Sequence, residues 1–293
     1  KGFFMSYRSV FRPGLFSGQT HIVTGGGSGI GRCTAHELAA LGAHVVLIGR
    51  SVERLEATAA EIREDGGECS FHSVDIRDEA GVQAVVAAIL AERGAIHGLV
   101  NNAGGQYPSP VASISKKGWE AVVANNLTGG FLFAREVYNQ YMGEHGGSIV
   151  NIVADMWRGM PGMAHSGAAR AGMLNLTETA AVEWARSGVR VNAIAPGFIA
   201  SSGMDRYDPA FTQVVIPQMS ATIPARRMGD EDEISGAIAF LLSPAASYTT
   251  GACLCIDGGS SLNTKLFPLV DHDRMTPQNA FHRAVRPKAV TGK

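Results

Sequence analysis

The sequence lacks several features that would assign it to other classes of protein. No apolar run reaches the ~18 residues that a membrane-spanning helix requires. Lysine and arginine, 25 together, nearly balance aspartate and glutamate, 26 together. Such a balance indicates neither a nucleic-acid partner nor a polybasic contact with a membrane. We therefore expect a protein without a membrane span and without a nucleic-acid partner.

Cysteine is also scarce, and the four residues are Cys33, Cys69, Cys253 and Cys255. They form no disulfide framework, and no further Cys or His follows the last two at metal-ligand spacing. We expect small buried side chains, no metal site and a reducing compartment. The chain shows neither a secretory leader pattern nor a peroxisomal C-terminal tripeptide, so we expect a cytoplasmic location.

Glycine, by contrast, is abundant at 36 residues, as expected for many tight turns between strands and helices. Strand and helix patterns alternate along the chain. The continuous apolar run 45–48 is typical of a strand buried on both faces, and 52–64 has the spacing of an amphipathic helix. Seven strands alternating with six helices predict a single-domain α/β Rossmann fold, with a doubly wound parallel sheet and helices on both faces.

The predicted domain covers residues 13–262. Residues 1–12 form a leader, 198–228 a substrate-loop insertion, and 263–293 a C-terminal tail. A long irregular loop in a compact domain is usually a lid or a binding loop. The tail has little periodicity, and we expect it either to wrap a neighbouring subunit or to be poorly ordered.

A glycine-rich turn follows the first predicted strand, 20–24. Gly25, Gly29 and Gly31, with Ser28 and Ile30 between them, lead into a helix predicted over 32–41. The chain must turn sharply there, bring its backbone against a pyrophosphate and direct free N–H groups of the helix start at the anion. The turn therefore predicts a dinucleotide site.

The end of the second strand indicates which dinucleotide binds. An NAD site usually places Asp or Glu there to accept from the ribose 2′-hydroxyl, but this chain has Gly49-Arg50-Ser51. The Arg50 guanidinium is suited to a 2′-phosphate, which favours NADP(H). In the alternative reading, Arg50 is an exposed residue at a helix start and either cofactor is accepted.

Three runs together resemble the short-chain dehydrogenase/reductase family. They are Thr24–Gly31, Asn101-Asn102-Ala103-Gly104 and Asn125-Asn126-Leu127-Thr128-Gly129. The resemblance implies several cofactor contacts and a water relay at Asn126. The implied contacts are Asp75 and Ile76 beside the adenine, Asn102, Ala103 and Gly104 along the adenosine ribose, and Pro196, Gly197 and Ile199 near the nicotinamide carboxamide.

The chain departs from this family at the reacting centre. Members usually carry Tyr-x-x-x-Lys, but Ser166 and Arg170 occupy that spacing here, and Ala154 stands where a serine is usual. Arg170 keeps a positive charge near the nicotinamide ribose but is no useful proton source. Ser166 is a hydrogen-bond donor and a very weak acid. Such a site suits hydride addition to an α,β-unsaturated thioester, whose oxygen needs hydrogen bonds more than a proton.

A narrower resemblance supports the same chemistry. The runs 146–152, 165–172 and 242–247, with the tail's 271–273, are similar to peroxisomal-type trans-2-enoyl-CoA reductases. This implies NADPH-dependent reduction of a small-molecule, acyl-CoA-like substrate in fatty acid metabolism. The family also implies a homotetramer, or a homodimer, built on helices predicted over 118–144 and 168–186. The alternatives are an NADP-dependent dehydrogenase of an alcohol or aldehyde and a non-catalytic NADP(H)-binding protein.

Several groups are candidates for the missing proton donor. Asp155 stands fifteen residues before Arg170, the offset of a tyrosine in related 2,4-dienoyl-CoA reductases. It is either a donor or a strand-end carboxylate paired with a base. His165 titrates near neutrality and either acts on the substrate or makes a structural hydrogen bond. Ser166, Asn126 and water complete the set.

Overall fold

The chain folds around one parallel sheet, as expected from the sequence. The computed structural model describes residues 6–206, 218–264, 266–287 and 290. Within them the sheet has seven strands in the order β3-β2-β1-β4-β5-β6-β7, and every neighbouring pair is parallel. The strands are β1 (Thr20–Thr24), β2 (His44–Gly49), β3 (Glu68–Ser73), β4 (Gly98–Asn101), β5 (Gly147–Ile152), β6 (Val189–Pro196) and β7 (Cys253–Ile256).

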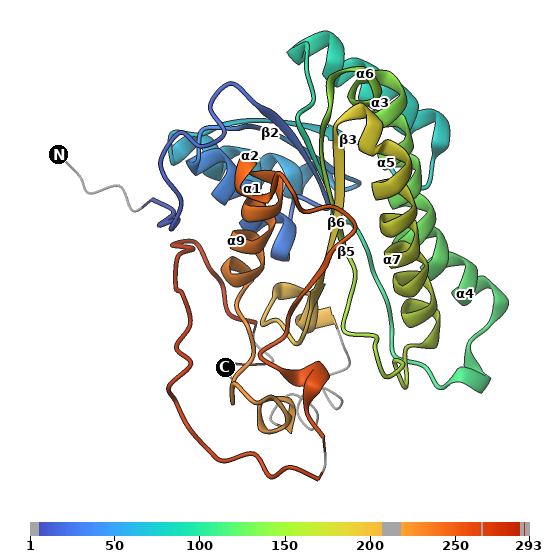
Figure 1. Cartoon of the computed structure of the whole chain (residues 1–293), viewed down its shortest axis with the longest axis vertical. Coiled ribbons are helices and arrows are strands. Elements are labelled where there is room, and N and C mark those ends of the chain that lie inside the picture. Colours follow the sequence, from blue (N-terminus) through green and yellow to red (C-terminus); the bar gives the residue numbers. More distant parts are fainter. Residues whose placement is uncertain (1–5, 207–217, 265, 288–289, 291–293) are drawn as a thin grey trace.

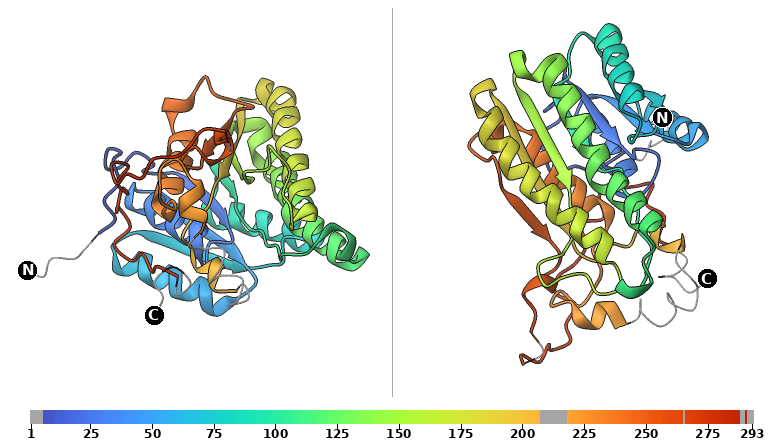
Figure 2. Two further views of the ribbon diagram at one scale, coloured as in Figure 1. Left: turned by 90° about the horizontal axis from the view of Figure 1, so that it is seen from below. Right: turned by 90° about the vertical axis from the view of Figure 1, so that its right-hand side faces the viewer.

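Helices cover both faces of the sheet (Figures 1 and 2). One face carries α1 (Gly29–Ala40), α2 (Val52–Glu64) and α9 (Glu231–Leu242). The other face carries α3 (Glu79–Arg93), α5 (Gly129–Val137) and α7 (Ala164–Trp184). The shorter helices α4 (Lys116–Val123) and α6 (Gly143–His145) precede and follow α5 along the chain. The central strands are apolar because both of their faces are covered, which confirms the doubly wound α/β fold class.

Two predicted helices differ from their sequence patterns. The helix predicted over 118–144 begins at Lys116, capped by the Ser115 side chain, and two π-helical turns, Ala124–Thr128 and Tyr138–Met142, separate α4, α5 and α6. The helix predicted over 168–186 begins at Ala164 and gains a turn at its start. These extensions matter because the first π-helical turn and the added turn of α7 carry candidate site residues.

The described parts of both terminal segments pack on α1. The Tyr7 hydroxyl lies 3.1 Å from the buried Glu37 carboxylate and 2.8 Å from Ser235 Oγ on α9. The Arg8 N–H donates to the carbonyl of Ala280 in the tail. Residues 6–12, predicted as part of a leader, therefore contact the domain closely, while residues 1–5 lie outside the described residues.

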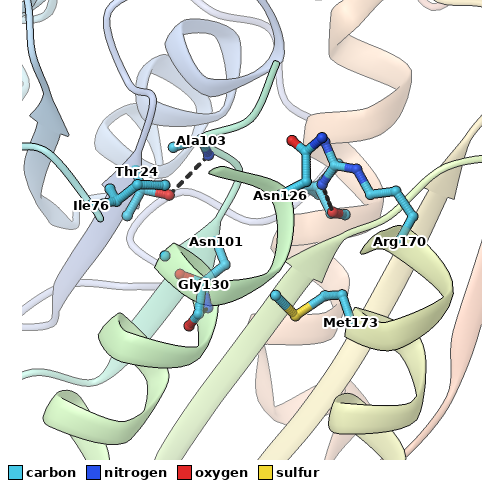
Figure 3. Close-up of a pocket in the computed structure, with 10 residues that line it drawn as sticks. Thr24, Ile76, Asn101, Ala103, Asn126, Gly130, Arg170 and Met173 are labelled. Atoms are coloured by element: carbon cyan, nitrogen blue, oxygen red, sulfur yellow. Dashed lines mark hydrogen bonds between the residues drawn. The ribbon is translucent and has the colours of Figure 1, made fainter. Parts of the chain in front are cut away.

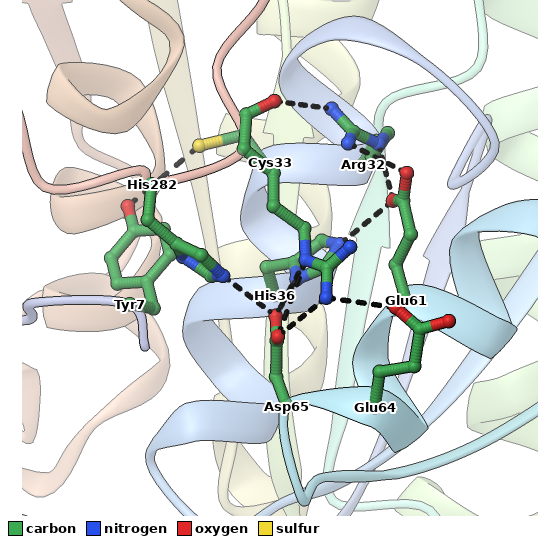
Figure 4. Close-up of polar contacts among 9 residues, drawn as sticks. Tyr7, Arg32, Cys33, His36, Glu61, Glu64, Asp65 and His282 are labelled. Carbon is green, nitrogen blue, oxygen red and sulfur yellow. Dashed lines mark hydrogen bonds and ion pairs between the residues drawn. The ribbon is translucent and has the colours of Figure 1, made fainter. Parts of the chain in front are cut away.

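The tail is held by ion pairs at the end of α2. Arg283 donates to both Asp65 and Glu64, and His282 Nε2 lies 2.9 Å from Asp65 (Figure 4). Residues 280 and 281 of the predicted tail pack on their own chain, against α1. Residues 265, 288–289 and 291–293 lie outside the described residues.

The part of the chain that the structure describes tests three expectations, on membrane spans, metal clusters and cysteine burial. There, no helix combines the length and apolar character needed to cross a membrane, and no cluster of His, Cys, Asp and Glu is arranged to hold a metal. Cys33 and Cys69 are buried as expected. The prediction is wrong for Cys255, which is exposed, and Cys253 is only half-buried. Both lie on β7, which pairs with β6 on one side and ends the sheet.

Candidate active site

The glycine-rich turn between β1 and α1 forms a cradle that only glycine allows. Gly25 and Gly29 have φ of +68° and +58°. A Cβ on Gly25 would lie 2.9 Å from Asn102 Nδ2, and one on Gly31 would lie 2.3 Å from the Gly25 carbonyl oxygen. Ser28 begins α1 without a side-chain cap, so the first N–H groups of α1 are free for an anion. These features fit the pyrophosphate of a dinucleotide.

The end of β4 is fixed beside this turn. Thr24 Oγ1 accepts a hydrogen bond from the Ala103 N–H at 3.0 Å (Figure 3) and another from the Asn102 N–H at 3.0 Å. The Asn102 side chain donates to the Thr24 carbonyl at 3.0 Å. Asn102, Ala103 and Gly104 thus lie at the carboxyl edge of the sheet, where parallel sheets bind ligands.

Two arginines lie in the segment that follows β2. Arg50 is exposed, and Arg54 lies in the first turn of α2, with its Cβ 3.0 Å from where a Cβ on Gly27 would stand. Asp75, after β3, accepts two hydrogen bonds from the Arg77 side chain, which lower the pKa of Asp75 to about 2. The sequence analysis missed Arg54, although its position in the first turn of the predicted helix 52–64, four residues after Arg50, was visible.

A half-buried cation lies at the centre of the site. The Arg170 side chain extends from α7 toward Asn126 and donates from Nη1 to the Ile152 carbonyl of β5 (Figure 3). Its Nε is buried and has no hydrogen-bond partner among the described residues. Burial lowers the pKa of Arg170 to about 10, so the guanidinium stays charged at neutral pH. An unpartnered, buried donor on a cation fits a hydroxyl or an anionic group of a bound cofactor.

Asn126 holds the loop after β4. From the first π-helical turn, its Nδ2 donates to the Gly105 carbonyl and its Oδ1 accepts from the Gly105 N–H, each at 2.9 Å. A Cβ on Gly104 would lie 2.7 Å from Asn126 Oδ1 and 2.5 Å from Arg170 Nη2. The resemblance implied a water relay at Asn126, but the amide pairs with backbone here. A cavity of about 10 Å³ that it lines with Arg170 has room for about one water.

Ser166 and His165 lie in the first turn of α7, and both are fully buried. Ser166 Oγ donates to Gln106 Oε1 at 2.5 Å, and the Ser166 N–H donates to His165 Nδ1 at 2.9 Å. A neutral His165 that accepts at Nδ1 carries its proton on Nε2. This Nε2 is buried without a hydrogen-bond partner in the described part of the chain.

The remaining predicted residues lie at the ends of β5, β6 and β7. Asp155 accepts from Ser260 Oγ at 3.0 Å, so the partner found for it is a hydroxyl rather than a base. Pro196 ends β6, and a Cβ on Gly197 would lie 2.7 Å from the Asp257 Cα. Ile199 is buried and pairs with Gly229. Of the predicted substrate loop, residues 207–217 lie outside the described residues.

Most predicted site residues therefore gather at one edge of the sheet. Sequence reasoning missed Gln106 and Tyr107, which contact Ser166 and His165. Their only sequence signal was their position directly after the Asn101–Gly104 run, since a loop after a strand end at this edge reaches the site.

A dinucleotide cradle next to a half-buried cation and a buried hydroxyl defines a nucleotide-dependent oxidoreductase. A family model described as enoyl-(acyl carrier protein) reductase matches residues 25–261. The chain belongs to the short-chain dehydrogenase/reductase family.

Curated relatives lie at moderate identity. A probable 2,4-dienoyl-CoA reductase of Bacillus subtilis is 36% identical over 246 residues, which cover 83% of this chain and 96% of the relative. A peroxisomal 2,4-dienoyl-CoA reductase of Rattus norvegicus is 36% identical over 257 residues, 87% of each chain. Both relatives are thus dienoyl-CoA reductases rather than the trans-2-enoyl-CoA reductases of the narrower resemblance. Since one of them is peroxisomal, the cytoplasmic location stays a prediction.

Several solved structures share the fold, and each match covers nearly the whole of the solved chain. The citronellol catabolism dehydrogenase AtuB of Pseudomonas aeruginosa PAO1 is 62% identical, with a TM-score of 0.78, and the match covers 87% of this chain and 100% of that chain. An NAD+-bound xylitol dehydrogenase is 35% identical (TM-score 0.80, covering 83% and 99%). A polyketide ketoreductase with NADPH is 29% identical (TM-score 0.80, covering 86% and 100%). The family thus uses either nicotinamide cofactor, and the expected homotetramer or homodimer stays a prediction.

Proposed function

We propose that this protein uses NADPH to reduce the carbon–carbon double bond of a trans-2-enoyl-CoA. The observation that carries the proposal is the pair on α7: a buried Ser166 hydroxyl and a half-buried Arg170 cation stand where the family usually has tyrosine and lysine. Neither group readily gives a proton to an alkoxide, because serine is a very weak acid and arginine holds its proton at neutral pH.

The proposed reaction fits what these two groups do well. NADPH, when bound, supplies the hydride that adds to the β carbon, and negative charge develops on the thioester oxygen. The Ser166 hydroxyl turns from Gln106 to donate to that oxygen, and the Arg170 charge stabilises it in a site of low dielectric. The free Nε of Arg170 would help hold the nicotinamide ribose. The α carbon takes its proton from the Nε2–H of His165 or from water, whereas Asp155 is bound to Ser260.

The test of this reaction is an assay of NADPH oxidation with crotonyl-CoA and longer enoyl-CoA substrates. We expect turnover with these thioesters and none with simple ketones. Ser166→Ala should lower kcat about a hundredfold, the usual cost of one lost oxyanion donor. The matched control is Ser148→Ala, which removes another buried hydroxyl, bound to the Leu241 carbonyl at the opposite end of β5. Equal kcat in wild type and Ser166→Ala would contradict the role of Ser166.

We also propose that the cofactor is NADP(H), held at its 2′-phosphate by Arg50 with help from Arg54. Arg50→Ala should raise KM for NADPH about tenfold and leave KM for NADH unchanged, because a charged hydrogen bond contributes about 1.5–3 kcal/mol and Arg50 is exposed. Steady-state kinetics with both cofactors check this. The control is Arg186→Ala, an exposed arginine after α7. A wild type that prefers NADH overturns this part of the proposal.

A second candidate is NAD(P)-dependent oxidation of a terpenoid alcohol. It is favoured by the 62% identity to a protein named as a citronellol catabolism dehydrogenase. Reduction of NADP+ or NAD+ with citronellol, without turnover of enoyl-CoA, would support this candidate over the first. Tight NADPH binding without turnover of any of these substrates would instead support a non-catalytic binding protein.

A further inference from the structure

We propose that Tyr107 is a specificity-determining residue whose ring forms the wall on which the reacting segment of the substrate packs. The preferred substrate is then flat and conjugated, as an enoyl thioester is. That choice of substrate rests on the proposed function, whereas the position of Tyr107 rests on the geometry alone.

The loop after β4 runs along the candidate site. Each of four consecutive loop residues approaches a different site residue. The pairs are Gly104 with Arg170, Gly105 with Asn126, Gln106 with Ser166, and Tyr107 with His165. Beyond them, the Ser109 N–H donates to the Gly162 carbonyl at 2.7 Å and joins this loop to the segment before α7. Tyr107 therefore directly follows the residue that accepts the hydrogen bond of the Ser166 hydroxyl, and its own ring contacts the neighbouring His165.

Both ends of the Tyr107 side chain are fixed. Its ring packs on His165 with centroids 4.7 Å apart and planes at 81°. Its hydroxyl lies against the first turn of α4, where a Cβ on Gly118 would be 2.0 Å from the phenol oxygen. Any larger residue at position 118 would displace the hydroxyl. The Tyr107 hydroxyl therefore fits against α4 only because Gly118 has no side chain.

The ring nevertheless remains 40% exposed, although it covers a fully buried histidine. A rigid aromatic surface beside a reacting centre suits a flat, conjugated group, because such groups pack favourably on aromatic faces. No arginine or lysine of the described residues stacks on the ring, so the surface that it offers is apolar. A conjugated acyl segment matches both its shape and its polarity.

Kinetics of three variants test the proposal. Tyr107→Ala should raise KM for the enoyl-CoA three- to tenfold, with KM for NADPH unchanged. Tyr107→Phe keeps the ring and should stay within twofold of wild type. Gly118→Ala pushes on the hydroxyl from α4 without touching the substrate, and should raise the same KM about threefold. Far-UV circular dichroism and Tm establish that each variant is folded.

Two outcomes overturn the role of Tyr107. They are an unchanged substrate KM in a folded Tyr107→Ala variant, and an equal rise in KM for NADPH. The substrate KM is measured with whichever substrate the wild type turns over, an enoyl-CoA or citronellol. A wild type that turns over citronellol but no enoyl-CoA therefore overturns the proposed function and not the role of Tyr107. If nothing turns over, calorimetric binding of crotonyl-CoA replaces KM. Absence of both turnover and binding overturns both proposals.

Discussion

Arg170→Ala should lower kcat/KM about a thousandfold in a protein that still folds. One lost interaction with the developing oxyanion costs about 10²–10³ in rate, and weaker cofactor binding adds to that loss. The surroundings of Arg170 explain why its positive charge matters for activity. Arg170 is half-buried, its Nη1 donates to the Ile152 carbonyl, and its buried Nε has no hydrogen-bond partner in the described residues. Burial of an unpaired charge is costly, so a negative partner is expected from bound molecules.

Two further variants separate charge from folding. Arg170→Lys keeps a cation and should stay within about tenfold of wild type, since lysine lacks the planar fork but retains the charge. Arg190→Ala is the matched control, because the Arg190 guanidinium also binds backbone carbonyls, of Leu241 and its neighbours, away from the site. It should affect Tm rather than kcat/KM. Steady-state kinetics and NADPH titration make the comparison, and a kcat/KM for Arg170→Ala within threefold of wild type would falsify the role.

Lowering the pH from 7 to 5 should remove about 4 kcal/mol of free energy of unfolding, about 2 kcal/mol from each of two buried histidines. Burial lowers the pKa of His21 to about 3 and that of His36 to about 4. Glu61 and Asp65 lie within 3.2 and 3.4 Å of His36, yet burial outweighs their effect on its pKa. His21 Nδ1 packs closely against Gly98, where a Cβ would lie 2.2 Å away, and has no hydrogen-bond partner in the described residues.

The direction of this pH dependence follows from the protons bound by the folded and the unfolded protein. In the folded protein both rings are neutral until the pH approaches 4, whereas in the unfolded chain histidine takes a proton near pH ~6.5. The unfolded state therefore binds more protons between these values, and stability falls as the pH falls through this window. Glu37 opposes the trend because burial raises its pKa. Asp65 adds to the loss only at lower pH, since hydrogen bonds from Arg283 and His282 outweigh its burial and lower its pKa.

Urea unfolding at pH 5, 6 and 7 measures this dependence. His21→Phe keeps a ring in the same space and should remove about half of the pH dependence. His145→Gln replaces an exposed histidine at the end of α6 and should leave the dependence unchanged. A pH dependence in His21→Phe equal to that of wild type would show that His21 is not a source of the effect.

Much of the fold followed from local patterns. The strands could be located because a strand covered on both faces must be apolar along its whole length, as in β2. The glycine turn could be located because Gly25 and Gly31 stand where any Cβ would collide with backbone or Asn102. The start of α7 was missed, since no capping residue marks Ala164 and the segment before it contains glycines and methionines.

The sequence located the candidate site residues but did not reveal which residues they contact. The spacing of Ser166 and Arg170 was visible, and the parallel topology brought both to the carboxyl edge of the sheet. Their partners were not visible: Ser166 pairs with Gln106, sixty residues earlier, and Asp155 with Ser260, more than a hundred residues later. Such pairs depend on the path of each loop, which no short pattern encodes.

The order of strands and helices, the dinucleotide turn and the absence of the family's usual tyrosine and lysine can all be read from short stretches of sequence. These features are local, because they depend on the size, polarity and backbone freedom of neighbouring residues. Three-dimensional packing, by contrast, pairs Asn126 with Gly105, folds the tail back on α1 and places Tyr107 over His165. These contacts join distant segments, and packing selects them only when the whole sheet and both helix layers are in place.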